Sequence, residues 1–346
     1  MSFRAQHLQA LPRVSAATFE EMALALFRYQ AAHCPPYAAY LAALRGPNHD
    51  WQQVRRLTDI PFLPIEFFKT HDVRTDPAQW EPAEIFRSSG TSQAPTRSRH
   101  ALREPELYRQ NARRIFELTY GPLTDYTFLA LLPSYLEQGE SSLVAMVADF
   151  VRASQQTEPA FFLHDHAALF EALRRARQPA PGERQARKVM LFGVSYALLD
   201  FAAAYPHRPE LRGLTVLETG GMKGRRRELI REELHADLQR AFGPAGIHSE
   251  YGMTELLSQA YSKGEGRFHC PPPLRLLLRD PADPFDVSAM GQTRPDGALN
   301  VIDLANVDSC AFIATQDLAR FHAQDGSFEV LGRLDNSDVR GCSQLV

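Results

Sequence analysis

Two kinds of segment alternate along the chain: short apolar runs and longer amphipathic stretches. In the amphipathic stretches apolar residues recur every three or four positions and the other face is charged, which predicts helices. The apolar runs contain many β-branched residues and are short enough to be buried strands. The predicted helices span residues 142–154, 166–177 and 225–242, and the predicted strands span residues 126–132, 188–194, 214–220, 274–279 and 298–304. Because strands alternate with helices, we expect an α/β fold with mostly parallel sheets.

The pattern changes in the last quarter of the chain. Pro and Gly cluster at residues 270–273 and 291–298, and the apolar segments there are short and separated by turns. We therefore expect α/β subdomains over about residues 1–270 and a small β-rich subdomain over about residues 271–334. Residues 335–346 are expected to form a mobile tail, because chain ends are seldom held by packing.

Composition and charge exclude several classes of protein. With 346 residues, 44% of them hydrophobic, the chain is long enough for a large core. Its 38 Lys and Arg residues nearly balance 41 Asp and Glu and form no long basic block, so no nucleic-acid partner is expected. There is no apolar run of about eighteen residues and no signal-peptide pattern, so we expect a cytoplasmic protein without a stable membrane anchor.

The cysteines are far apart in the sequence and form no CxxC pair, which argues against a zinc site and a disulfide framework. They are Cys34, Cys270, Cys310 and Cys342. Free thiols in a reducing compartment are therefore expected.

The segment FRSSGTSQAPTRS (86–98) is poor in bulky side chains and rich in hydroxyls. Its residues Ser88, Ser89, Gly90 and Thr91 suit a loop that wraps a phosphate, because Gly90 permits close backbone approach while amides and hydroxyls donate to phosphate oxygens. An ordinary polar turn has the same composition, so this segment alone leaves both interpretations open.

A second candidate segment is IHSEYGMTELLSQAY (247–261). It places Tyr251, Gly252, Thr254 and Glu255 within five positions after a possible strand. Glu255 is suited to Mg²⁺, which prefers one or two carboxylates together with phosphate oxygens, and Thr254 can donate to a phosphate. The alternative is the start of a helix.

A third segment, residues 315–338, contains a predicted hairpin with its turn at Gln324 to Ser327. Asp317 and Arg333 bracket this hairpin, so its two strands bring them together. A carboxylate there can accept hydrogen bonds from both ribose hydroxyls, and an Arg can donate to ribose or phosphate oxygens. A surface ion pair is the simpler interpretation of the pair taken alone.

Order and spacing change this balance. A hydroxyl-rich loop, an aromatic-Gly-x-Thr-Glu segment, Thr-x-Asp and Gly-Arg-x-Asp follow one another in an order that resembles the core motifs of the adenylate-forming superfamily, from about residue 60 onward. The resemblance implies the large-domain fold of that superfamily, with ATP and Mg²⁺ as cofactors and a carboxylic acid as substrate.

The resemblance also implies roles for individual residues. Ser88, Ser89, Gly90 and Thr91 would hold the ATP phosphates, Tyr251 would lie near the adenine, and Gly252 would be part of the cofactor site. Thr254 and Glu255 would act in catalysis, Glu255 as the Mg²⁺ ligand, and Asp317 and Arg333 would hold the ribose. The stretch ETGGMKG (218–224) resembles the glycine-rich turn on the adenine side, through Gly220 and Gly221. A plain exit from a strand into a loop would explain these two glycines equally well.

Two motifs depart from the superfamily pattern. Relatives carry a second Gly and a Lys in the phosphate loop, where this chain has Gln93 and Ala94, and Gln316 replaces the Gly of a Thr-Gly-Asp motif. These departures keep open a catalytically inactive relative that serves as a binding subunit. Retention of Glu255, Asp317 and Arg333 argues for an enzyme.

The end of the sequence is a larger departure. Most relatives continue into a further small domain, whereas this sequence ends eleven residues after Asp335. Residues 60–73 (IPFLPIEFFKTHDV) and 335–342 (DNSDVRGC) resemble the acyl-protein synthetase (LuxE-like) family. That resemblance implies that Cys342 receives the acyl group, expected to be a fatty acyl group, and delivers it to a reductase partner.

The chemistry of Cys342 fits this role without the resemblance. An acyl adenylate is an activated mixed anhydride, and a thiolate attacks it readily. Arg340 would favour the thiolate and Asp338 would oppose it. Two alternatives remain: an incidental exposed cysteine, and a ligase that uses coenzyme A in place of Cys342.

Overall fold

The computed structural model describes residues 1–88, 97–132, 139–163, 165–179, 186–206, 208–220, 231–243, 246–289 and 294–334. The α-helices are α1 (Phe3–Ala10), α2 (Ala16–His33), α3 (Pro35–Arg45), α4 (Phe67–Thr70), α5 (Pro105–Tyr120), α6 (Ser142–Ala153), α7 (His166–Ala176), α8 (Ser195–Ala204) and α9 (Arg231–Phe242). The strands are β1 (Leu63–Pro64), β2 (Glu84–Arg87), β3 (Arg99–Leu102), β4 (Tyr126–Leu131), β5 (Lys188–Val194), β6 (Thr215–Thr219), β7 (Ile247–Tyr251), β8 (Ala260–Ser262), β9 (Phe268–His269), β10 (Leu274–Arg279), β11 (Val287–Ala289), β12 (Asp296–Asp303), β13 (Phe312–His322) and β14 (Ser327–Arg333).

One mixed sheet runs through the fold in the order β11-β10-β12-β13-β14-β9-β8-β7-β6-β5-β4, and β1 adds to it beside β13. Strands β4 to β7 are parallel to one another, whereas β7 and β8 are antiparallel. Strands β2 and β3 form a separate hairpin. The segment that leaves the end of β7 therefore lies where the parallel part of the sheet meets the antiparallel part.

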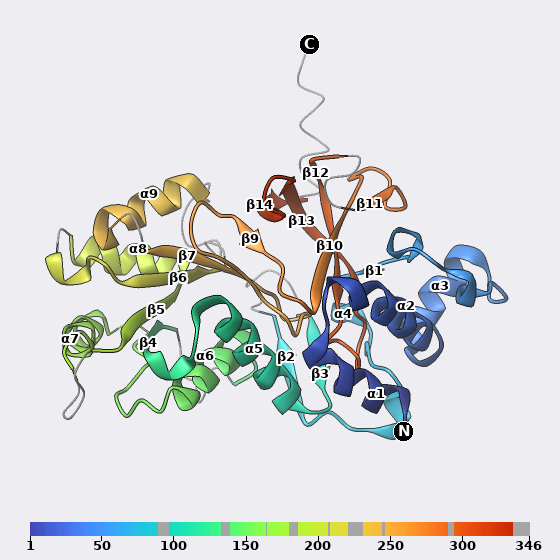
Figure 1. Cartoon of the computed structure of the whole chain (residues 1–346), viewed down its shortest axis with the longest axis horizontal. Helices are drawn as coiled ribbons and strands as arrows, with labels where there is room; N and C mark the ends of the chain where they lie inside the picture. The colour runs from blue at the N-terminus through green and yellow to red at the C-terminus, as the bar shows by residue number, and fades with distance from the viewer. Residues whose placement is uncertain are drawn as a thin grey trace, which may run out of the picture.

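Helices cover both faces of the parallel strands. Figure 1 shows α8 and α9 on one face and α5 and α6 on the other. Helix α7 packs against α8 through the stacked rings of Phe170 and Tyr205, whose centroids are 4.6 Å apart. On α5 the buried residues Tyr108, Ala112 and Phe116 recur at intervals of four, as an amphipathic helix requires. Burial of one such Phe side chain is worth about 1.5–3 kcal/mol.

Local sequence signals set several helix ends. Asp165 caps α7 by accepting a hydrogen bond from the amide of Ala168 at 2.9 Å, and Ser141 caps α6 in the same way. Helix α5 ends at Gly121, whose φ of +89° is strained for other residues. Each cap satisfies a backbone group that the helix itself leaves without a partner.

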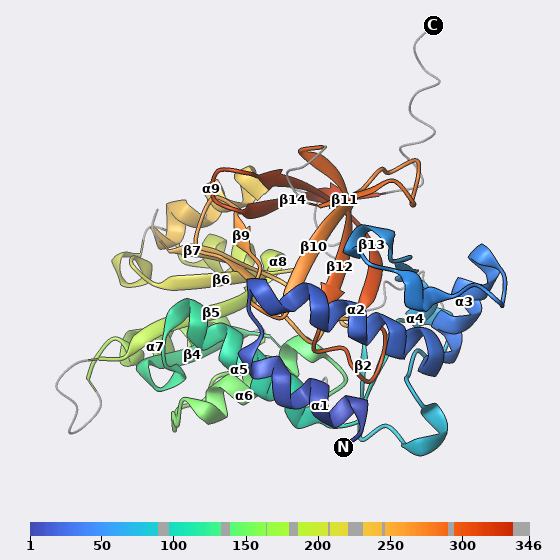
Figure 2. The ribbon, with the colours of Figure 1, turned by 45° about the vertical axis from the view of Figure 1, so that its right-hand side comes forward.

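The N-terminal helices support the antiparallel part of the sheet. Figure 2 shows α2 lying across β10 and β12, and the guanidinium of Arg275 on β10 sits 4.1 Å from the ring centroid of Phe19 on α2. Buried Gln30 of α2 donates to the carbonyl of Asn306 at 2.7 Å and accepts from the amide of Ala311 at 2.9 Å. These bonds fix the loop between β12 and β13.

The strands and helices agree closely with the sequence pattern. Strands β4, β5, β6, β10 and β12 lie within two residues of the predicted runs, and α6 and α7 within one residue of the predicted helices. Helix α9 is described from Arg231 onward, so the first part of the helix predicted over 225–242 lies outside the described residues. The hairpin predicted to turn at 324–327 is the β13–β14 pair. Among the described helices, none is both long and apolar enough to cross a membrane.

Candidate functional site

The hairpin of β2 and β3 carries the two ends of the hydroxyl-rich segment. Ser88 and Ser98 close the hairpin, because the Ser88 amide donates to the Ser98 carbonyl at 3.1 Å and the Ser98 amide donates to Ser88 Oγ at 3.0 Å. Arg97 Nε donates to the Ser88 carbonyl at 2.6 Å. Ser88 is therefore placed at the base of the candidate phosphate loop. Ser89, Gly90 and Thr91, together with Gln93 and Ala94, lie outside the described residues.

Glu255 lies next to this base. Its side chain is only 5% exposed and accepts a hydrogen bond from the Ser98 side chain. Burial raises the pKa of the Glu255 carboxyl, while the Ser98 hydrogen bond and the positive charges of Arg333 and Lys69 oppose that rise. The Ser98 hydrogen bond and the neighbouring positive charges do not fully offset the cost of burying the Glu255 carboxylate. This carboxylate is therefore suited to bind a cation, alone or together with a phosphate.

The segment from Gly252 to Glu255 forms turns and not a helix, so the helix interpretation of this segment is wrong. The Thr254 carbonyl binds the His100 ring at 2.8 Å, and the Glu255 carbonyl accepts from Asn306 Nδ2 at 2.8 Å. A Cβ at Gly252 would come within 2.2 Å of Glu250 Oε1, so only Gly fits there without displacement of Glu250.

Tyr251, Asp317 and Arg333 form a connected group. The Tyr251 hydroxyl donates to Asp317 Oδ2 at 2.9 Å, and Arg333 Nε is 3.6 Å from Asp317 Oδ1. Asp317 and Arg333 are direct partners across β13 and β14. Burial raises the pKa of Asp317, and the Tyr251 hydrogen bond and the Arg333 charge oppose it. The Arg333 side chain is 66% exposed, so its donors remain accessible to a ligand.

Gln316 occupies the position where the resembling family has Gly. Its Nε2 donates to Glu66 Oε1 next to α4, and its Oε1 lies 3.5 Å from an Arg333 guanidinium nitrogen. The Gln316 side chain thus joins two segments of the site, through its contacts with Glu66 and Arg333.

Gly220 follows β6 with a φ of +69°, which favours glycine. Ser195 Oγ lies 2.6 Å from the Gly220 carbonyl and 3.1 Å from the Glu218 carboxylate. Ser195 is the first residue of α8, and the cap position is Val194 without a side-chain hydrogen bond. Ser195 therefore does not cap α8. Gly221 lies outside the described residues, as does Cys342.

Three residues at the site were missed by sequence reasoning: Ser98, His100 and Asn306. Ser98 is the last residue of the hydroxyl-rich segment and His100 lies two residues beyond it, and this proximity is the local signal that could have drawn attention to them. Asn306 contacts Glu255 across 51 residues of sequence, and no local pattern predicts such a contact.

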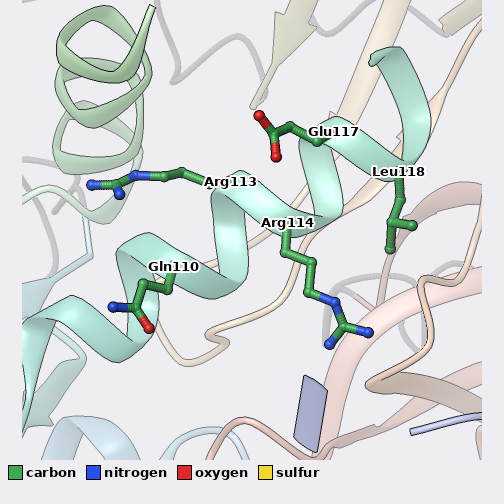
Figure 3. A pocket seen from close by; sticks show the side chains of 5 residues that line it. All are labelled: Gln110, Arg113, Arg114, Glu117 and Leu118. Carbon is green, nitrogen blue, oxygen red and sulfur yellow. The ribbon is translucent and has the colours of Figure 1, made fainter. Parts of the chain in front are cut away.

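A hollow on the surface of α5 is separate from this group. Figure 3 shows the side chains that line it, Gln110, Arg113, Arg114, Glu117 and Leu118. Arg113 points away toward α6, where it binds the Asp149 carboxylate at 2.5 and 2.7 Å. The hollow shares no residue with the described part of the site, so we assign it no part in the candidate chemistry.

The donors around Glu255 fit one kind of metal site. Within the described ranges, no three His, Cys, Asp or Glu side chains gather into a preformed metal cluster. Mg²⁺ in phosphate-binding enzymes commonly uses one or two carboxylates and takes its other ligands from phosphate oxygens and water. A single buried carboxylate beside the loop base therefore fits Mg²⁺ that arrives with a nucleotide.

The sequence matches no protein-family model and no curated protein. Solved structures do match. A 2-hydroxyisobutyryl-CoA ligase with 2-HIB-AMP and CoA in the thioesterification state has a TM-score of 0.64 at 15% identity, over 93% of this chain and 69% of that one. An open conformation of the same ligase has a TM-score of 0.63 at 15% identity, over 93% and 76%.

An ATP-bound RpMatB-BxBclM chimera has a TM-score of 0.52 at 15% identity, over 85% of this chain. This chain spans about half of the chimera, 52% of its length. Both kinds of neighbour are adenylate-forming enzymes. The chain therefore has the mixed α/β fold of the adenylate-forming enzymes.

Proposed function

We propose that this protein activates a carboxylic acid with ATP, to give an acyl adenylate and pyrophosphate. The observation that carries the proposal is the convergence of the segments that bear these motifs. Ser98 at the loop base interacts with Glu255, and the charge of Arg333 acts on the Glu255 carboxyl. Arg333 also forms an ion pair with Asp317, to which Tyr251 donates a hydrogen bond. These are the segments whose order in the sequence resembles the adenylate-forming motifs.

The proposed roles are those that the resemblance implies, and the arrangement is compatible with them. The loop that begins at Ser88 holds the phosphates together with Thr254, while Asp317 and Arg333 hold the ribose and Tyr251 and Gly220 lie on the adenine side. Mg²⁺ bound at Glu255 would supply positive charge to the phosphate oxygens. A carboxylate oxygen of the acid attacks the α-phosphorus, and the bond to the pyrophosphate oxygen breaks, so pyrophosphate leaves with the electron pair.

For the second half-reaction we propose Cys342 as acceptor. Its thiol loses a proton, the thiolate attacks the acyl carbonyl, and AMP leaves as the phosphate anion. The resemblance of residues 60–73 and 335–342 to acyl-protein synthetases supports this step, a fatty acid as substrate and a reductase as the recipient of the acyl group.

A second candidate is a coenzyme A ligase. The similar 2-hydroxyisobutyryl-CoA ligase was solved with an acyl adenylate and CoA, so the shared fold supports CoA as the acceptor equally well. The two candidates differ in the need for Cys342.

The first half-reaction is tested by ATP–pyrophosphate exchange across a panel of aliphatic and aryl carboxylic acids. Glu255→Gln keeps the shape of the side chain but removes its charge, so exchange should fall about 10²-fold or more. Glu171→Gln, on the exposed face of α7, is the matched control and should exchange at the wild-type rate. Absence of exchange by the wild-type protein with every acid would favour the inactive binding subunit.

The second half-reaction is tested with a radiolabelled acid and mass spectrometry of the C-terminal peptide. Cys342→Ser should abolish the protein-bound thioester while exchange continues. Cys270→Ser is the matched control, because Cys270 is partly buried and burial raises the pKa of its thiol to about 12. Formation of acyl-CoA by Cys342→Ser at the full rate would replace the carrier-cysteine proposal by the coenzyme A ligase.

A further inference from the structure

His100 of β3 lies at a junction of three segments. Its ring is 1% exposed. Nδ1 is 2.8 Å from the Thr254 carbonyl oxygen, and Nε2 is 3.0 Å from Ser309 Oγ. The Phe68 ring of α4 packs edge-on against it, with 5.6 Å between the centroids.

The hydrogen bond to the Thr254 carbonyl determines the tautomer of His100. A carbonyl oxygen only accepts, so Nδ1 must carry the hydrogen. Burial lowers the pKa of the ring to about 4, so the imidazole is neutral at physiological pH and Nε2 has a free lone pair. Ser309 must then donate its hydroxyl hydrogen to Nε2.

The geometry points to His100 as a positioning residue that holds Thr254 and Glu255 against the base of the 88–98 loop. This inference rests on the proposed function, because the residues it positions are those proposed to act on ATP. Ser98 and His100 are two positions apart, so their side chains leave the same side of the extended chain. Ser98 binds the Glu255 side chain, and His100 binds the neighbouring Thr254 carbonyl.

The opposite side of the same segment is held by the loop that follows β12. The Asp303 carboxylate accepts hydrogen bonds from the amides of Leu257 and Ser258, at 2.8 Å each. Asn306 Nδ2 donates a hydrogen bond to the Glu255 carbonyl. Ser309, from the same loop, donates to His100. His100 thus closes a clamp around residues 254–258, with β3 on one side and the 303–309 loop on the other.

Three variants separate positioning from mere packing. In His100→Asn, the amide nitrogen can take the place of Nδ1 and donate to the Thr254 carbonyl. His100→Phe keeps an aromatic ring of similar size but has no donor. Ser309→Ala leaves the bond to the Thr254 carbonyl, which sets the tautomer, and removes only the hydrogen bond at Nε2.

We expect His100→Phe to lower kcat of ATP–pyrophosphate exchange about 10- to 100-fold, because catalytic groups misplaced by about 1 Å cost roughly this much. The Mg²⁺ concentration for half-maximal exchange should also rise. His100→Asn should retain kcat to within a few-fold, and Ser309→Ala should lie between the two. Equal kinetics of the Phe and Asn variants would overturn the inference.

Two measurements do not depend on activity. A long-range ¹H–¹⁵N spectrum of the wild-type protein, assigned with His100→Asn, should show a neutral His100 ring with its hydrogen on Nδ1. Hydrogen exchange of peptides covering residues 252–262 should be faster in His100→Phe and unchanged in His100→Asn. An Nε2–H tautomer, or equal exchange in the two variants, would overturn the inference even if wild-type activity is normal.

The same measurements distinguish the two proposals. Failure of the wild-type protein to exchange pyrophosphate with any acid, combined with the expected tautomer and hydrogen exchange, would refute the proposed function and leave His100 as a residue that orders residues 254–258. If His100→Phe does not fold, Ser309→Ala and the wild-type tautomer still decide the inference.

Discussion

Glu250 offers a test of the electrostatics beneath the candidate site. Glu250 is the second-last residue of β7. Its Oε2 accepts a hydrogen bond from Thr219 Oγ1 of β6, and its Oε1 lies close to Gly252. Desolvation raises the pKa of Glu250 to about 7, the negative charge of Glu218 adds to the rise, and the Thr219 hydrogen bond opposes it. The carboxyl of an unfolded chain titrates at its ordinary value of 4.5.

The sign of the effect on stability follows from these two values. Between pH 4.5 and about 7, folded Glu250 keeps a proton that the unfolded chain has released. Its contribution to stability is therefore fully present below pH 4.5 and is lost as the pH rises toward 7. Each pH unit in this window costs about 1.4 kcal/mol, so the loss between pH 5.5 and 8 is about 2 kcal/mol.

Glu250→Gln isolates this contribution, because the amide cannot ionise but its oxygen can still accept from Thr219. Urea unfolding followed by circular dichroism at pH 5.5, 7 and 8 gives the free energy of unfolding for both proteins. We expect the variant to gain about 2 kcal/mol on the wild type between pH 5.5 and 8. A difference between the two proteins that stays constant with pH would refute the reasoning. Thr219→Val, which removes the donor, should extend the loss of stability to higher pH.

Two further predictions concern close contacts of the site. Gly252→Ala should destabilise the protein by about 1–3 kcal/mol through the clash with Glu250 Oε1, and Glu250→Ala in the same chain should recover most of the loss, measured as a double-mutant cycle of unfolding free energies. Arg333→Ala should raise KM for ATP in pyrophosphate exchange about tenfold, with a change in stability below about 0.5 kcal/mol, because the side chain is largely exposed. Its control is Arg320→Ala, whose ion pair with Asp296 also lies at the surface; an equal rise of KM in both variants would contradict the proposed ribose role of Arg333.

The local hydrophobic pattern of the sequence predicts much of the fold but only part of the candidate site. The parallel strands β4, β5 and β6 are largely apolar runs, so the hydrophobic pattern alone locates them to within two residues, whereas β7 (Ile247–Tyr251) alternates buried with partly buried residues and has no such run. The approach of Asp317 to Arg333 was predictable to within one residue, because the turn sets the register of a hairpin, and a bulge between Leu318 and Ala319 then shifts the pairing by one residue. The contacts of Ser98 and His100 with residues 254 and 255 were not, because they join segments more than 150 residues apart whose meeting depends on the whole sheet.

The segment over residues 60–73 now has a physical explanation. Leu63 pairs with Ile313 in the β1–β13 ladder, which fixes α4 beside the end of the sheet. From there Phe68 packs on His100, and Glu66 accepts a hydrogen bond from Gln316. One short segment thus contacts both the residue that positions the Thr254 turn and the residue that approaches Arg333.

This arrangement accounts for a glutamine where the resembling family has glycine. With a glycine at position 316, Glu66 would lose this amide donor. Of its contacts with Gln316 and Asp317, Arg333 would keep only the one with Asp317. The Gln316 side chain instead connects α4 to β14 through one amide. The contacts of residues 60–73 and the glutamine at position 316 are therefore two parts of one structural feature. Replacement of Glu66 or Gln316 should make the Arg333 side chain more mobile, although neither side chain is proposed to contact a nucleotide.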